Sequence, residues 1–267
     1  MNTPAGFEMK NGRMVNVQPL EAMFNSSFIV RAFHVVATAG MTMAFILAAI
    51  AAFKLLRNKH SEDKTYHKKA LKMTMIVGFL STILSMVAGD LSAKFLHKVQ
   101  PEKLAAYEWH YDTQSHANLV FFGVLNEKTH EVTGAIEIPG LLSFLADDSF
   151  KTKVKGLTDF PKNDLPPMIV HYFFDLMVSM GVFCFIISGL YMLILFFKKL
   201  RKFKVNKAML YAILLTGPAS LLAIEFGWFL TEMGRQPWII RGYMRVSQAA
   251  TQAGGITLVT ILFGILY

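Results

Sequence analysis

Five long apolar runs constrain this chain more than any other feature of its sequence. They lie at residues 27–53, 70–95, 168–197, 208–230 and 249–267, and apolar side chains make up 54% of the 267 residues. A helix needs about 20 apolar residues to cross about 30 Å of hydrocarbon. The first four runs exceed this length, and the last run barely reaches it. We therefore predict an all-α, polytopic membrane helix bundle with five transmembrane helices and a long loop after the second.

Basic residues predict which ends of these helices face the cytoplasm, because Lys and Arg accumulate in short cytoplasmic connections. Two connections are rich in them: Lys54, Arg57, Lys59, Lys64, Lys68 and Lys69 in the first, and Lys198, Lys199, Arg201, Lys202, Lys204 and Lys207 in the second. Residues 1–26, the loop 97–166 and the turn 234–245 are then expected outside. The helices fall into a first pair within 27–96 and a last group of three within 167–267.

The remaining composition excludes several classes of function. The formal charge of +9 comes largely from the two basic connections, so it indicates membrane topology rather than nucleic-acid binding. Cys184 is the single cysteine and lies in the third apolar run, which predicts a packed thiol without a disulfide in this chain. No phosphate-binding glycine loop or Ser/His/Asp spacing is present. The polar groups cluster toward the outer third of the helices, which disfavours a transporter.

Two side chains at similar depth are candidates for holding a cofactor. His34 lies about 10 Å into the first helix and Met177 about 13 Å into the third, counted from the outer side. An imidazole nitrogen and a thioether sulfur can be the two axial ligands of a haem iron. The alternatives are a helix-to-helix hydrogen bond for His34 and ordinary packing for Met177. His171, nearer the interface, is predicted to be a wetted side chain.

Acidic residues near the outer ends of the helices are a further candidate site, because ionisable groups inside a membrane are costly. Glu225 and Glu232 are seven residues apart on one face of the fourth helix. Such carboxylates can ligate a high-spin haem iron or transfer protons. The alternative for Glu232 is an ion pair with Arg235 or Arg241. Asp90 and Asp175 could likewise pair with an external arginine or lie near a haem.

Four short segments carry a resemblance to one family. They are Gly234-Arg235-Gln236-Pro237-Trp238 following Trp228 and Glu232, Phe33-His34, Phe174-Asp175-Leu176-Met177-Val178, and Lys103-Leu104-Ala105-Ala106-Tyr107-Glu108. With these segments the chain resembles the C-terminal part of subunit I of cytochrome bd quinol oxidase. The loop 97–166 is similar to a short version of that family's quinol-binding loop. Where many members have an arginine two residues before the methionine, this chain has Asp175. Either the helix orients its haem differently, or another base such as Arg31 serves in place of the arginine.

The resemblance implies a role for each matching residue. His34 and Met177 would ligate a low-spin haem b, and Glu232 would ligate a high-spin haem, with Trp228 and Arg235 beside it and Glu225 as a further catalytic carboxylate. Lys103 and Glu108 would contact quinol, Lys103 by hydrogen bonding and Glu108 by accepting a proton. The alternative for Lys103 and Glu108 is a solvated helical turn with a surface ion pair.

The resemblance also implies partners and a location. The expected location is a bacterial cytoplasmic membrane, and the expected partners are quinol, molecular oxygen, subunit II and lipid. A high-spin haem b and haem d are expected only in the complete complex. The family's first four helices have no counterpart in this chain, so we expect a fragment or split gene product that is inactive alone. The alternative from another class is a non-catalytic module that holds or helps assemble only the low-spin haem b.

Overall fold

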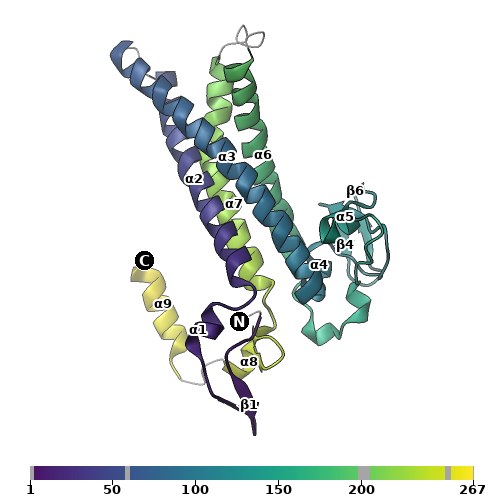
Figure 1. Cartoon of the computed structure of the whole chain (residues 1–267). Coiled ribbons are helices and arrows are strands. Elements are labelled where there is room, and N and C mark those ends of the chain that lie inside the picture. The colour runs from purple at the N-terminus through teal and green to yellow at the C-terminus, as the bar shows by residue number, and fades with distance from the viewer. Residues whose placement is uncertain (1–2, 58–60, 198–204, 250–253, 267) are drawn as a thin grey trace.

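The computed structural model describes residues 3–57, 61–197, 205–249 and 254–266. Four helices are long and apolar enough to cross a membrane, and they lie side by side as one bundle (Figure 1). These are α2 (Phe28–Arg57), α3 (Ser61–Val99), α6 (Val170–Phe196) and α7 (Lys207–Met233). The predicted class, a mostly helical multi-pass bundle, is confirmed.

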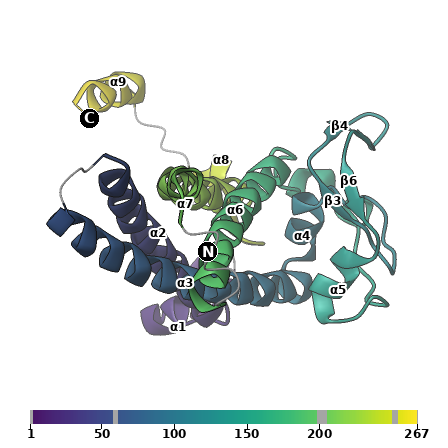
Figure 2. The ribbon, with the colours of Figure 1, turned by 90° about the horizontal axis from the view of Figure 1, so that it is seen from above.

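The last expected span differs from the other four. It is represented by α9 (Ile256–Leu266), a helix of 11 residues, while residues 250–253 and 267 of that span lie outside the described residues. Seen from above, α9 stands apart from the other long helices (Figure 2). All its described side chains are exposed. The bundle itself therefore rests on four helices.

Small residues let the helices of the bundle approach closely. A Cβ atom at Gly217 of α7 would lie 2.8 Å from the Cβ of Ala49 on α2, so only glycine fits there. The hydroxyl of Thr42 donates a hydrogen bond to the carbonyl oxygen of Ser220 at 3.3 Å. Such small-residue contacts and interhelical hydrogen bonds are what hold helices together in lipid. Cys184 is free and buried, which confirms the packed thiol.

The last turns of α2 and α6 and the first turns of α3 and α7 lie at the same end of the bundle (Figure 1). Lys54 and Arg57 are in the last turn of α2, and Lys207 begins α7. Six of the predicted topogenic residues lie outside the described residues: Lys59, Lys198, Lys199, Arg201, Lys202 and Lys204. The N-terminal segment and the turn after α7 lie at the opposite end, as expected when connections rich in Lys and Arg alternate along the chain with connections that are not.

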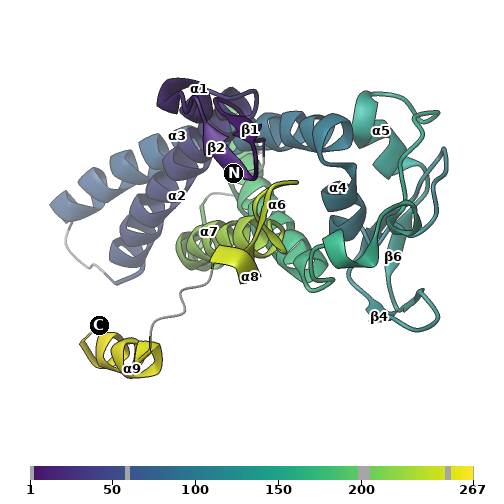
Figure 3. The same cartoon turned by 90° about the horizontal axis from the view of Figure 1, so that it is seen from below.

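The long loop folds into its own small structure beside the ends of α3 and α6 (Figure 3). Its elements are α4 (Pro101–Tyr107), β3 (Leu119–Phe121), β4 (Val124–Asn126), β5 (Glu131–Thr133), β6 (Ile136–Ile138), α5 (Leu141–Asp147), η1 (Leu157–Asp159) and η2 (Lys162–Asp164). Strand β3 pairs antiparallel with β6, and β4 pairs with β5 inside it. These short strands were not predicted from the sequence.

Two further hairpins lie at the same end. Strands β1 (Glu8–Lys10) and β2 (Arg13–Val15) pair in the N-terminal segment, which ends in the short helix α1 (Pro19–Met23). After α7 the chain forms β7 (Trp238–Ile240), β8 (Met244–Arg245) and α8 (Val246–Ala249). The β7–β8 hairpin contributes Trp238 and Arg241 to a pocket at this end of the bundle.

Candidate functional site

His34 projects from α2 toward α3. A Cβ atom at Gly89 of α3 would lie 4.0 Å from its Cε1 atom. The Nδ1 atom of His34 is buried and has no hydrogen-bond partner among the described residues. Buried polar atoms are nearly always paired. The imidazole therefore presents a nitrogen that the described helices leave available.

Met177 lies on α6 and faces α7. A Cβ atom at Gly227 of α7 would lie 3.1 Å from the Met177 sulfur, and Met177 packs against a buried cluster that includes Tyr107 and Leu230. Helices α3 and α7 each pack against both α2 and α6. The two predicted ligands thus lie on different helices of one bundle, and each side chain packs beside a glycine of a neighbouring helix.

Glu225, Trp228 and Glu232 all lie on α7. The Glu232 carboxylate accepts a hydrogen bond from Arg235 at 2.5 Å, which is the ion pair that the sequence left as an alternative. Glu225 is exposed, and the Trp228 side chain is 57% exposed. Within the described part of the chain this face of α7 is therefore open around Glu225.

Lys103 and Glu108 are both buried, Lys103 on the short helix α4 and Glu108 at its end. Their side chains are 6% and 2% exposed, so the alternative of a solvated turn with a surface ion pair is wrong. Burial, reinforced by the positive charge of Arg31, lowers the pKa of Lys103 to about 7. Burial, reinforced by the neighbouring Asp175, raises the pKa of Glu108 well above its ordinary value. Each group is therefore shifted toward its neutral form.

The turn at 234–238 packs directly on α4. A Cβ atom at Gly234 would lie 2.7 Å from the Tyr107 hydroxyl and 2.9 Å from the Lys103 Cε atom. The same Cβ would lie 2.6 Å from the carbonyl oxygen of Leu230. Close packing against the loop therefore requires the glycine of the signature motif. Its backbone conformation does not, because a φ of −69° is one that any residue adopts.

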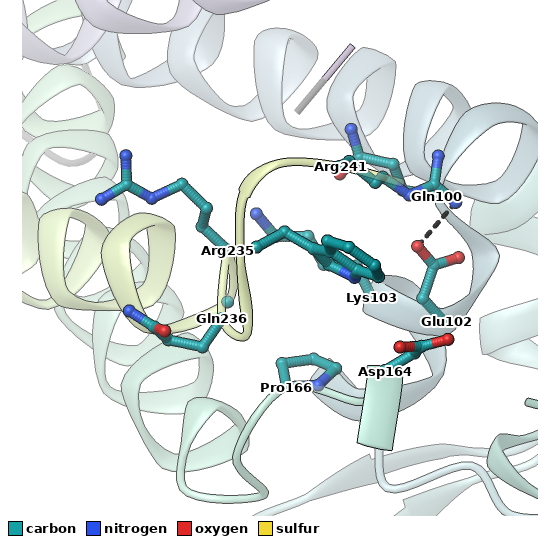
Figure 4. Close-up of a pocket in the computed structure, with 10 residues that line it drawn as sticks. Gln100, Glu102, Lys103, Asp164, Pro166, Arg235, Gln236 and Arg241 are labelled. Atoms are coloured by element: carbon teal, nitrogen blue, oxygen red, sulfur yellow. Dashed lines mark ion pairs between the residues drawn. The ribbon is translucent and has the colours of Figure 1, made fainter. Parts of the chain in front are cut away.

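A polar pocket opens between α4, the end of the loop and this turn (Figure 4). It is lined by Gln100, Glu102, Lys103, Asp164, Pro166, Gly234, Arg235, Gln236, Trp238 and Arg241. The guanidinium of Arg241 pairs with Glu102 at 2.6 Å and donates to the carbonyl oxygen of Val99 at 2.7 Å. Arg245 pairs with Asp164 at 2.5 Å. The pocket is thus lined by both hydrogen-bond donors and acceptors.

Sequence reasoning missed a buried pair on α6. His171 was expected to be a wetted side chain, and this was wrong, because His171 and Asp175 are both fully buried beneath the loop. The His171 Nε2 atom lies 3.1 Å from a carboxylate oxygen of Asp175. Their spacing of four residues, which places both on one helix face, was the available signal. Asp90 pairs with Lys94 at 2.7 Å rather than with an arginine.

Fold and site together define a multi-pass membrane protein with a polar pocket at one end of its bundle and a histidine and a methionine within it. The chain belongs to the cytochrome bd terminal oxidase subunit I family, whose model matches residues 1–267.

Individual relatives agree with this family. A putative cytochrome bd menaquinol oxidase subunit I of Bacillus subtilis (strain 168) is 40% identical over 266 residues, which cover 99% of this chain and 60% of the relative. Cytochrome bd ubiquinol oxidase subunit 1 of the same organism is 31% identical over 284 residues, covering 100% of this chain and 59% of the relative. The bd oxidase structure from Geobacillus thermodenitrificans superposes with a TM-score of 0.90 at 44% identity, covering 100% of this chain and 60% of that one. The chain thus spans about 60% of these relatives.

Proposed function

We propose that this chain is part of subunit I of a cytochrome bd-type terminal oxidase that oxidises quinol and reduces oxygen. The observation that carries the proposal is the burial of Lys103 and Glu108 at the two ends of α4, with Lys103 packed against Gly234 of the 234–238 turn. Two relatives whose names state quinol oxidation support it. Because the chain spans about 60% of their length, activity requires the remaining part of subunit I, together with subunit II, in a bacterial cytoplasmic membrane with the loop outside.

The chemistry of quinol oxidation suits the two buried side chains. A quinol gives up electrons readily only when its hydroxyl protons have an acceptor nearby. Lys103 would donate a hydrogen bond to one ring oxygen, and Glu108 would take the hydroxyl proton. The raised pKa of Glu108 increases the affinity of its carboxylate for a proton, and the ionised form of Glu108 is the one that would accept the hydroxyl proton.

The residues in the bundle fit a haem iron. His34 has a buried nitrogen without a partner among the described residues, and Met177 lies on α6 of the same bundle. His34 and Met177 would hold a low-spin haem b, which supplies a one-electron carrier when bound. Glu232 would hold a high-spin haem b in the complete complex, where haem d also binds. Beside it, Arg235 pairs with the Glu232 carboxylate, Trp228 lines the same face and Glu225 would transfer protons.

Replacing Glu108 with glutamine in the assembled oxidase tests the quinol site. We expect the rate of oxidation of a reduced short-chain naphthoquinone to fall by about 100-fold, because the proton acceptor is lost. Oxygen uptake driven by an artificial one-electron donor should stay unchanged. Glu127→Gln is the control, because Glu127 is exposed in the same loop. Native rates for Glu108→Gln would contradict the proposal.

Replacing Met177 with leucine tests the haem ligand. The assembled oxidase should lose the low-spin haem b band and gain a high-spin spectrum, since leucine cannot bind iron. Met180→Leu is the control on the same helix, where the side chain packs against the apolar core. An unchanged low-spin band in Met177→Leu would exclude this assignment.

A second candidate function is a non-catalytic module that holds only the low-spin haem b. It is favoured by the presence of both His34 and Met177 in a chain that spans about 60% of its relatives. Reduced-minus-oxidised spectra of the chain alone in detergent separate the two functions. A stable low-spin b band together with native assembly of oxidase in cells lacking this chain would favour the module.

A further inference from the structure

The loop segment around Glu108 is held on the first turns of α6 from both sides. The carbonyl oxygen of Tyr107 lies 2.6 Å from the His171 Nδ1 atom. The indole nitrogen of Trp109 donates to the carbonyl oxygen of Met168 at 2.8 Å, and its ring stacks on the His171 ring with centroids 3.9 Å apart. His171 therefore touches the residue before Glu108 and the residue after it.

A second loop segment is fixed by the same helix face. The backbone amide of Phe122 donates to a carboxylate oxygen of Asp175 at 2.5 Å, and this oxygen also lies 3.1 Å from His171. Phe122 has a φ of +56°, a conformation that costs free energy in a residue with a side chain and must be held by its surroundings. The Tyr172 hydroxyl donates to the next carbonyl, that of Gly123, at 2.9 Å.

Both segments converge on Glu108. Its carboxylate is hydrogen-bonded by the backbone of Val120, in strand β3, which ends just before Phe122. Its Oε2 atom has no hydrogen-bond partner among the described residues. The direction of this carboxylate is thus set by the backbone on either side of it and by β3. His171 and its partner Asp175 tie down all of these.

We propose that His171 is a positioning residue for quinol oxidation, which acts by fixing the position of the Glu108 carboxylate. The inference rests on the proposed function of Glu108. A displacement of about 1 Å in a reacting group can cost about 100-fold in rate. Loss of the His171 contacts should therefore slow proton acceptance from bound quinol while Lys103 and the pocket still bind it.

Substitution of His171 in the assembled oxidase tests this role. His171→Leu removes both ring nitrogens, whereas His171→Asn keeps an amide donor close to the position of Nδ1 and preserves the bond to Tyr107. With a reduced short-chain naphthoquinone we expect kcat to fall by about 30-fold in the leucine variant, with KM changed less than about twofold. The asparagine variant should recover most of the rate. His130→Leu is the matched control, because that histidine is exposed in the same loop and stacks on Tyr111.

A double variant separates positioning from general damage. In the Glu108→Gln background His171→Leu should cost nothing further, because the group it positions is gone. An equal further loss in that background, or a leucine variant as fast as the native oxidase, would overturn the inference. If His171→Leu fails to assemble, His171→Gln, which lacks a donor near Nδ1, replaces it with the same expected outcomes. Native turnover of Glu108→Gln alone would instead refute the proposed function.

Discussion

Glu108 and Glu225 are two carboxylates of this chain in opposite surroundings. Glu108 is 2% exposed and is enclosed by α4, β3 and the first turns of α6, all from this chain. Glu225 is exposed on α7, at a depth where a bare carboxylate in lipid is costly. The surroundings of Glu108 are therefore built by residues of this chain, whereas the face around Glu225 needs another surface to cover it.

The largest expected effect comes from filling the close contact between Gly234 of the turn and α4. Gly234→Ala places a Cβ atom within 3 Å of Lys103, Tyr107 and the carbonyl of Leu230, and overpacking of this kind costs about 1–3 kcal/mol. We expect quinol oxidation to fall by about 100-fold through displacement of Lys103, measured by oxygen uptake. Gly181→Ala on α6 is the control, because a Cβ there meets nothing within 4 Å. Equal rates in the two variants would show that the turn does not shape the pocket.

A smaller effect is expected on the open face. Glu225→Gln should lower oxygen uptake by about tenfold and leave KM for quinol unchanged, because water can partly replace a carboxylate that relays protons. Steady-state kinetics with the artificial one-electron donor should show the same tenfold loss. A raised KM for quinol would contradict this contrast between the two carboxylates, since it would tie Glu225 to quinol binding.

The smallest effect is a dependence of stability on pH. The pKa of Lys103 is about 7 in the folded chain, below its ordinary value. Between these two values the unfolded chain binds more protons, so stability rises with pH from about 7 to about 10. Relative to Lys103→Met, the native loop should gain about 1 kcal/mol per pH unit at most over this window. Rates of limited proteolysis of the loop at several pH values measure it, and parallel profiles would place Lys103 in solvent.

The lengths of the apolar runs were enough to predict the membrane helices of the fold. The four long helices appear where the runs predicted them, but α3 begins at Ser61, before the apolar run at 70–95, because polar residues continue a helix beyond the membrane. The pairing of β3 with β6 and of β4 with β5 has no such signal. Short strands depend on contacts between distant residues rather than on local pattern.

The site was predictable only where a family motif named it. The sequence singled out Lys103 and Glu108, but their burial and the contact with Gly234 depend on how the loop folds back. His171 was predicted to be wet because its depth along α6 was counted without the loop that covers it. The pairing of Glu232 with Arg235 was an open alternative, since residues three apart on a helix are neighbours.

The two arginines of the β7–β8 hairpin have a consequence for how the loop can vary. Arg241 holds the start of the loop through Glu102 and the carbonyl of Val99, and Arg245 holds its end through Asp164. A segment tied at both ends can lengthen in the middle at little cost, because closure entropy grows only slowly with length. Insertions at the tip between β4 and β5 should leave the walls of the pocket in place, so this loop can diversify without redesign of the chemistry beneath it.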